Sequence, residues 1–335
     1  MATTRCPELV EGLRFSANIN TFNACADRYV LSGYGERLTT EELIKAATQV
    51  EGLTGVEVVG LWHVNDDNLE QMHRQIQDAG LVVTCVTPDI WASGKWGWGS
   101  FSSNDAQIRR DAIHEVKKSM EWAKQLNCEI VDLWFGQDGY DYPLQADYLV
   151  AWDRIIEGTI ECAEHMPEVK LVIEYKPKEP RTHCFIATVG KTLLLVEKVD
   201  KPNVGAMIDV GHALMAYESA AESAAMLQYF GQKLFYMHFN DNWRLWDDDM
   251  TVGSVHIVEM LELLYWLDRM NYNGWYALDI FPYREDGVRA ATESILWIKG
   301  LHSLLDKIGR DRIGQVIASG DAMEASAMIR EALLG

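Results

Sequence analysis

Four side chains of the kind that bind metal ions end four successive apolar segments of the chain. The segments are KLVIE (170–174), VGAMID (204–209), LFYMH (234–238) and WYALD (275–279), and their last residues are Glu174, Asp209, His238 and Asp279. Each segment is typical of a short, buried strand. The ligands are 35, 29 and 41 residues apart, about the length of one strand and one helix. Parallel strands closed into a barrel bring their carboxyl ends to one face, so the pattern predicts a divalent-cation site.

Two further polar residues lie close to these ligands in the sequence. Lys176 follows Glu174 by two positions, and because alternate side chains of a strand share a side, we expect an ammonium group beside this carboxylate. His212 follows Asp209 by three positions, and the pair could bind two adjacent ions if the carboxylate bridges them. The alternative for Glu174 and Lys176 is a surface salt bridge on the proline-containing turn that follows.

An aspartate run and a histidine add candidates on two other loops. Asp247 and Asp249 alternate in WDDDMTVG, soon after His238. Two such carboxylates can hold one cation, and hard oxygen ligands favour Mg²⁺ or Mn²⁺ over zinc, although a solvated turn is the alternative. His63 and Asp66 lie in WHVNDD, where the aspartate could fix the tautomer of the histidine or hold a proton. A structural role for this histidine stays open.

The twelve tryptophans indicate what kind of molecule the site binds. Several of them stand in predicted loops or beside the polar residues above: Trp62, Trp91, Trp96, Trp98, Trp134, Trp243 and Trp246. Core packing is the alternative for any one of them. Several flat aromatic walls at one barrel face suit stacking against the C–H faces of a sugar. Trp62, Trp91 and Trp134 are therefore candidate substrate contacts, together with Phe281 in the turn after the last apolar segment.

The elements that would position these residues alternate regularly between strand and helix. Four earlier strands are predicted at 13–19, 56–60, 81–87 and 129–135, and helices at 39–50, 104–126, 147–166, 189–199, 216–230, 254–270 and 288–306. The alternation has no break in composition, so it predicts one α/β (β/α)8 TIM barrel over residues 1–306. Residues 307–335 leave this pattern and predict a short helical extension, packed outside or reaching a neighbouring subunit.

The composition restricts the class of protein. The chain has 335 residues, 48% of them hydrophobic, enough for a large core. A net charge of −20 argues against nucleic acid as a partner, and no apolar segment is long enough to span a membrane. The six cysteines form no CxxC pair and the first residues do not resemble a secretory signal, so we expect reduced thiols in a cytoplasmic protein.

Taken together, the motifs resemble those of the xylose isomerase superfamily of TIM barrels, from about residue 13 to 300. IEYKPKEPR resembles the Glu-Pro-Lys-Pro signature of that family, with Tyr175 in place of its first proline. DVGHALMA, WDDDMTVG and WHVNDD resemble its Glu-Val-Gly-His stretch, its paired-aspartate loop and its catalytic histidine with a supporting aspartate. SFSSNDAQIRR and LWFGQDG resemble two further segments of the family.

The resemblance implies one or two divalent metal ions per subunit, Mn²⁺ or Mg²⁺, with Co²⁺ as a further candidate. The first ion would be bound by Glu174, Asp209, His238 and Asp279, and the second by Asp209, His212, Asp247 and Asp249. Lys176 would stabilise negative charge on a carbonyl oxygen, and His63, oriented by Asp66, would assist ring opening. The tryptophans would enclose a monosaccharide or a sugar-derived substrate, and a homo-oligomer, dimer or tetramer, is expected.

Two ligand types separate the hypotheses on function. Xylose isomerase itself has glutamate at the place of Asp209 and aspartate at the place of His238, whereas the set found here is similar to that of L-rhamnose isomerase. Sugar 3-epimerases carry a second glutamate where this chain has Asp279. The leading hypothesis is therefore an aldose–ketose isomerase acting by a metal-assisted hydride shift. A single-metal epimerase or a C-glycoside-cleaving enzyme, each acting by proton abstraction, is the alternative, and a sugar-binding barrel without activity is disfavoured.

Overall fold

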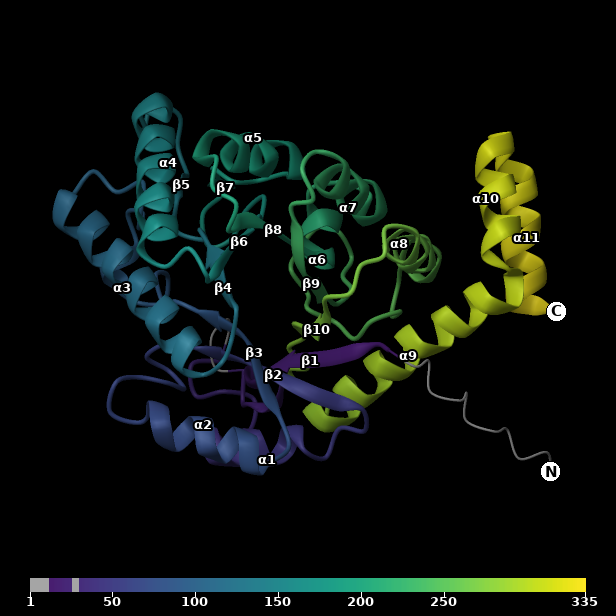
Figure 1. Ribbon diagram of the computed structural model, residues 1–335, viewed down its shortest axis with the longest axis horizontal. Helices are drawn as coiled ribbons and strands as arrows, with labels where there is room; N and C mark the ends of the chain where they lie inside the picture. The colour runs from purple at the N-terminus through teal and green to yellow at the C-terminus, as the bar shows by residue number, and fades with distance from the viewer. Residues whose placement is uncertain (1–11, 26–29) are drawn as a thin grey trace.

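The barrel is formed by eight parallel strands, as predicted. A computed structural model describes residues 12–25 and 30–335, and within them the strands close in the order β1-β10-β9-β8-β6-β4-β3-β2 (Figure 1). Their bounds are β1 (Arg14–Asn18), β2 (Leu53–Val59), β3 (Val82–Thr87), β4 (Ile130–Trp134), β6 (Lys170–Glu174), β8 (Val204–Asp209), β9 (Leu234–Phe239) and β10 (Trp275–Leu278). The apolar segments of the sequence thus become the barrel wall, because strands covered on both faces need apolar side chains on both sides.

Helices surround the barrel and follow the strands in the chain (Figure 1). They are α1 (Thr40–Ala47), α2 (Leu69–Asp78), α3 (Ala106–Gln125), α4 (Tyr148–His165), α5 (Val189–Val199), α6 (Val210–Met215), α7 (Ala220–Tyr229), α8 (Ile257–Arg269), α9 (Gly287–Ile308), α10 (Arg310–Ser319) and α11 (Ala322–Leu334), with short 3₁₀ turns at Ile19–Phe22 and Gly94–Trp96. Thr39 caps α1 in a capping box with Glu42, where the sequence predicts one. The cap of α3 is Asp105, one residue after the predicted Asn104.

Two helices and a small sheet are absent from the sequence-based prediction. Helix α2 buries only three residues, Leu69, Met72 and Ile76, and its remaining positions are mainly polar. Helix α6 has six residues, all buried, and directly continues β8. Strands β5 (Gly139–Tyr140) and β7 (His183–Cys184) pair antiparallel and join the loop after β4 to the loop after β6. Helix α6 and the two-residue strands are too short to carry a readable period, whereas Leu69, Met72 and Ile76 of α2 have the i, i+3, i+7 spacing of an amphipathic helix, so that pattern was missed.

The register of the barrel brings the ends of neighbouring strands to one level. Trp134 pairs with Glu174 across β4 and β6, and Asp209 pairs with His238 across β8 and β9. Below them, side chains from six strands fill the interior: Cys85, Ile130, Val172, Met207, Tyr236 and Ala277. The barrel is therefore a packed core, and the predicted ligands Glu174, Asp209 and His238 lie at the carboxyl ends of its strands.

The C-terminal helices pack against one another rather than on the barrel mouth. Helices α10 and α11 contact the C-terminal part of α9 and lie apart from the barrel wall (Figure 1). The division at residue 307 stays a prediction, as does a role of this segment in assembly. Among the described residues, no helix is long and apolar enough to cross a membrane. The five described cysteines are buried, and Cys6 lies outside the described residues.

Candidate metal centre

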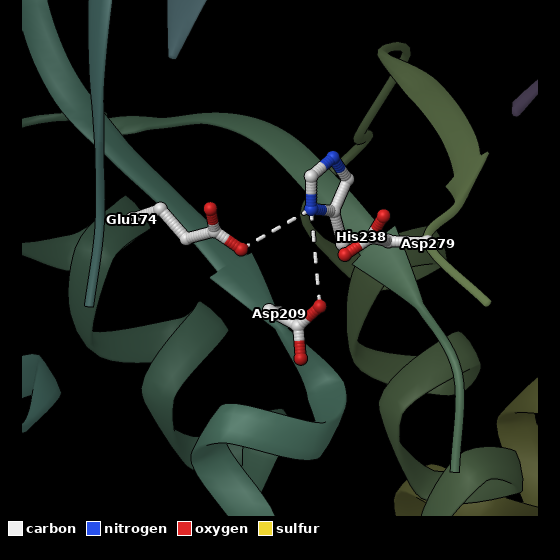
Figure 2. A group of neighbouring side chains, drawn as sticks. All are labelled: Glu174, Asp209, His238 and Asp279. Carbon is white, nitrogen blue, oxygen red and sulfur yellow. Dashed lines mark hydrogen bonds and ion pairs between the residues drawn. The ribbon is translucent and has the colours of Figure 1, made fainter. Parts of the chain in front are cut away.

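Four predicted ligands converge at the carboxyl ends of four neighbouring strands. Glu174, Asp209 and His238 lie at the ends of β6, β8 and β9, and Asp279 directly follows β10 (Figure 2). Each offers one ligand atom, and these atoms all lie within 4.8 Å of one another. The Nδ1 atom of His238 is 3.3 Å from Glu174 Oε1 and 3.8 Å from Asp209 Oδ2. The four side chains thus surround a space that one cation could fill.

A second group shares one residue with the first. Ligand atoms of Asp209, His212 and Asp247 also lie within 4.8 Å of one another. Asp209 caps helix α6 by accepting a hydrogen bond from the backbone N–H of His212 at 2.8 Å, which explains why the two side chains lie side by side. Asp249 is buried nearby but does not belong to this compact group.

Lys176 lies beside the second group. Its Nζ atom donates to Asp247 Oδ2 at 2.6 Å and lies 3.3 Å from Glu179 Oε2. The ammonium group is also 5.3 Å from the ring centre of Trp134, within the range of a cation–π contact. Burial alone would lower the pKa of Lys176, but Asp247 and Glu179 outweigh it and raise this pKa. Lys176 therefore stays charged although it is buried.

Asparagine side chains hold the carboxylates in place. The Nδ2 atom of Asn240 donates to Asp209 Oδ2 at 2.8 Å and to the backbone carbonyl of Asp279 at 3.1 Å, while its Oδ1 accepts from Gly211 N at 2.7 Å. Asn18 donates to Asp279 Oδ1 at 3.1 Å. A Cβ atom at Gly211 would stand 2.8 Å from Asn240 Oδ1, so glycine is needed for this close approach. Neither asparagine was predicted from the sequence.

Glu57 on β2 is a further functional residue that the sequence did not reveal. Its carboxylate is buried and accepts from His238 Nε2, at 3.2 and 3.0 Å to its two oxygens. Tyr236 donates its hydroxyl to Glu57 Oε1 at 2.8 Å. A carboxylate on the far nitrogen of a histidine orients the ring and directs the other nitrogen, here Nδ1, to the ion. Only the alternation of strand residues, which turns Glu57 inward, could have suggested it.

Crowding of acids shifts several pKa values in the cluster. Burial, together with the Asp209 and Glu174 carboxylates, raises the pKa of Asp279 to about 7. Burial alone would lower the pKa of His212, but Asp209 and Asp247 raise it to about 9. Burial and the Glu174 carboxylate raise the pKa of Asp132, on β4, well above its usual range. Repulsion of this kind between buried acids is relieved when a divalent cation binds.

His63 and Asp66 do not interact in the way that the sequence suggested. The Nδ1 atom of His63 accepts from the backbone N–H of Val59 at 2.9 Å, and its Nε2 faces Asn20 Oδ1 at 3.2 Å. Asp66 points away and binds Trp122 and Lys118. The first turn after β2 folds back on the strand, so the backbone, and not Asp66, fixes the tautomer of His63. Burial lowers the pKa of His63 to about 4, so its imidazole is neutral at pH 7.

The aromatic candidates fall into two places. The rings of Trp62, Trp91 and Trp134 contact one another in this order. The ring centres are 5.7 Å apart between Trp62 and Trp91 and 5.2 Å apart between Trp91 and Trp134. Phe281 lies on the loop after β10, where its backbone N–H donates to the Asp249 carbonyl at 2.9 Å. Among the described residues, Phe281 has no ring contact with the three indoles.

The donor set fits a divalent metal ion. The first group offers three carboxylates and one imidazole, and the second offers two carboxylates and one imidazole, which suits Mn²⁺ or Mg²⁺ better than a thiolate site would. The Nδ1 atom of His212 is buried and has no hydrogen-bond partner, as expected of an atom reserved for a ligand.

Comparison with known proteins identifies the family of the chain. A family model described as xylose isomerase-like TIM barrel matches residues 44–301, so the chain belongs to this family. Among solved structures it is similar to a D-tagatose 3-epimerase-like protein, with 19% identity and a TM-score of 0.68 over 88% of this chain and 99% of that one.

Two further structures are similar to a comparable degree. A xylose isomerase domain protein from Alicyclobacillus acidocaldarius has 14% identity and a TM-score of 0.64, over 87% of this chain and 98% of that one. A D-psicose 3-epimerase from Clostridium cellulolyticum H10, solved with D-tagatose, has 15% identity and a TM-score of 0.67, over 86% and 99%. At these identities the likeness establishes the fold alone.

Metal binding should depend on pH, because a cation must displace protons from the cluster. In the metal-free protein, His212 with a pKa of about 9 and Asp279 with a pKa of about 7 are protonated below these values. The affinity for Mn²⁺ should therefore fall as the pH decreases from 9 to 6, about tenfold per unit for each displaced proton. Calorimetric titration in buffers of different ionisation enthalpy measures both affinity and proton release. An affinity that is flat over this range would contradict the assignment.

Replacing Glu57 should weaken metal binding through His238. Glu57→Gln keeps the side-chain volume but removes the charge that orients the imidazole, so Mn²⁺ affinity should decrease about tenfold to a hundredfold. Glu129→Gln makes the same change on an exposed side chain at the other end of the barrel and serves as the control. Calorimetry, with circular dichroism to verify the fold, measures the difference. Equal affinities in the two variants would show that Glu57 has no such role.

Proposed function

We propose that the protein is a divalent-metal-dependent sugar isomerase that interconverts an aldose and a ketose. The observation that carries the proposal is the position of Lys176 beside two ligand groups that share Asp209. A shared carboxylate can bridge two ions, and a charged lysine next to them can bind a carbonyl oxygen of a sugar. The fold family and the D-tagatose in a similar structure are consistent with a monosaccharide or sugar-derived substrate.

The side chains of the site have distinct roles in this proposal. Glu174, Asp209, His238 and Asp279 would hold a first ion, and Asp209, His212 and Asp247, with Asp249, a second. Such an ion, when bound, polarises a carbonyl and fixes neighbouring hydroxyls. Lys176 would donate a charge-assisted hydrogen bond to the carbonyl oxygen as negative charge develops on it. His63, neutral at pH 7, would donate from Nε2 to the ring oxygen, and Trp134 would exclude water.

The proposed reaction moves hydrogen between two neighbouring carbons without releasing it. The hydrogen and its electron pair pass from C2 of the aldose to C1, and the proton of the C2 hydroxyl ends on the C1 oxygen. No side chain has to remove a proton from carbon. The length of Asp279 is consistent with this, because an aspartate reaches less far than the second glutamate that sugar 3-epimerases carry.

Epimerisation by proton abstraction is the second candidate, and one observation favours it. Burial and neighbouring carboxylates raise the pKa of Asp279 to about 7, the range in which a carboxylate makes an effective general base near neutral pH. The similar structures of a D-tagatose 3-epimerase-like protein and a D-psicose 3-epimerase agree with this candidate. Cleavage of a C-glycoside would use the same kind of proton abstraction.

Isotope exchange distinguishes the two reactions. The protein is reconstituted with Mn²⁺, screened on aldoses and ketoses, and the active pair is then converted in D₂O. A hydride shift should leave the transferred hydrogen unlabelled, whereas abstraction through a carboxylate exchanges it with solvent. Mass spectrometry and proton NMR of the product measure the label. Substantial deuterium on the transferred position, or a C3 epimer as the product, would refute the isomerase proposal.

Lys176→Met should abolish turnover while leaving metal affinity nearly intact. Methionine keeps the approximate length of the side chain but cannot stabilise charge on the carbonyl oxygen, so kcat should decrease by at least about a hundredfold. Calorimetry with Mn²⁺ checks that the ligand groups survive. Lys178→Met, two residues further on at a half-buried lysine that hydrogen-bonds the Leu245 carbonyl, is the matched control and should retain activity. Loss of metal binding in Lys176→Met would mean that the lysine supports the ligands rather than the reaction.

A further inference from the structure

Three indole rings contact one another in a row from the exposed Trp62 to Trp134 beside Lys176, with interplanar angles of 46° and 64°. The ring centres of Trp62 and Trp91 are 5.7 Å apart, those of Trp91 and Trp134 are 5.2 Å apart, and Lys176 Nζ is 5.3 Å from the centre of Trp134. We call these three residues the indole track. They come from three different segments, namely the loop after β2, the loop after β3 and the end of β4.

The indole track is most exposed at Trp62, the end farthest from Lys176. Trp134 and Trp91 are half-buried, whereas 45% of Trp62 is exposed. A tryptophan left open to water gains little from burial, so packing alone does not explain its position. Large apolar side chains exposed at the functional face of a barrel are typical of a surface that a ligand covers.

The outer end of the indole track is held in place by a single carboxylate. Asp89 Oδ2 accepts from Trp62 Nε1 at 2.8 Å, and Asp89 Oδ1 accepts from the backbone N–H groups of Trp91 and Ala92 at 3.3 and 2.9 Å. Gln137 Nε2 donates to the Trp91 carbonyl at 3.0 Å. The rings are therefore fixed before a ligand arrives, which lowers the entropy lost on binding.

We propose that Trp62 forms an outer subsite for a second sugar ring, so that the substrate is a reducing disaccharide. The proposal rests on the function proposed above, because it takes the reacting sugar to lie between Trp134 and the ligand groups. One sugar ring covers about one indole face, so a monosaccharide on Trp134 leaves Trp62 uncovered. The second ring must be attached at the end of the reacting sugar remote from its carbonyl, since the carbonyl end faces Lys176.

The polar groups between the rings favour a sugar over an aromatic substituent. A carboxylate has about four acceptor positions, so Asp89 can accept from one ligand hydroxyl in addition to its three protein donors. A sugar ring presents both an apolar face for Trp62 and hydroxyls at its edge for Asp89. An aromatic ring without hydroxyls would use the indole face alone.

Equilibrium binding to the Mn²⁺-loaded protein tests the subsite. The Kd of each monosaccharide in a panel of aldoses is compared by calorimetry with the Kd values of its 4-linked and 6-linked disaccharides. At least one disaccharide should bind about twofold to tenfold more tightly than its own reducing sugar, the value of one aromatic contact. Trp62→Ala should remove this advantage, and Trp62→Phe should retain most of it. Trp98→Ala, at an indole that is 77% exposed and outside the track, is the control and should keep the advantage.

Three outcomes would overturn the subsite. The first is a panel in which no disaccharide binds more tightly than its reducing sugar. The second is an equal loss of affinity for the monosaccharide and the disaccharide in Trp62→Ala. The third is a phenyl-substituted sugar that binds more tightly than every disaccharide. The measurement needs no turnover. A disaccharide preference that depends on Trp62 in a protein without isomerase activity would therefore refute the proposed reaction and retain the subsite.

Discussion

Repulsion among buried carboxylates at the barrel mouth is the constraint on which the rest of the site depends. Asp209, Glu174 and Glu57 each add to the burial that raises the pKa of Asp279, and Glu174 raises that of Asp132. Acids brought this close are stable only if protons, hydrogen bonds or cations compensate them. The structure supplies the hydrogen bonds through Asn18 and Asn240, and the histidines supply part of the positive charge.

The barrel makes this arrangement possible because its strands are rigid and its register is fixed. Trp134 pairs with Glu174, and Asp209 pairs with His238, so a shift of one strand by one residue would turn a ligand out of the site. The packed layer of side chains below the ligands prevents such a shift. The same alternation that points His238 to the cluster points Glu57 to His238 from β2, on the same side of the barrel interior.

The sequence predicts both the barrel and the main metal-ligand candidates, because both follow from local patterns. Glu174, Asp209 and His238 end apolar segments, and such segments can be read without knowledge of their neighbours. Glu57 and Asn240 could not be found in this way, since their roles depend on which strands lie side by side. Asp66 was assigned to His63 from spacing alone, and the backbone turn after β2 takes that place instead. Local spacing does not determine which way a loop side chain points.

In the proposed function, chemistry and specificity are carried by different parts of the fold. The ligands of the first group lie at the ends of strands, whereas Trp62 and Trp91 lie on loops that are tethered by other loops. Arg181 donates to the carbonyls of Gly97 and Gly139 at 2.9 and 3.1 Å, and so joins the loop after β3 to the loop after β4. Because these loops are tied to each other rather than to the ligands, their sequence and shape can vary between related proteins while the ligand groups keep their positions. If Trp62 forms the proposed outer subsite, one set of ligands would serve sugars of different length, and the position of Trp62 would set how far from the ligand groups a substrate is recognised.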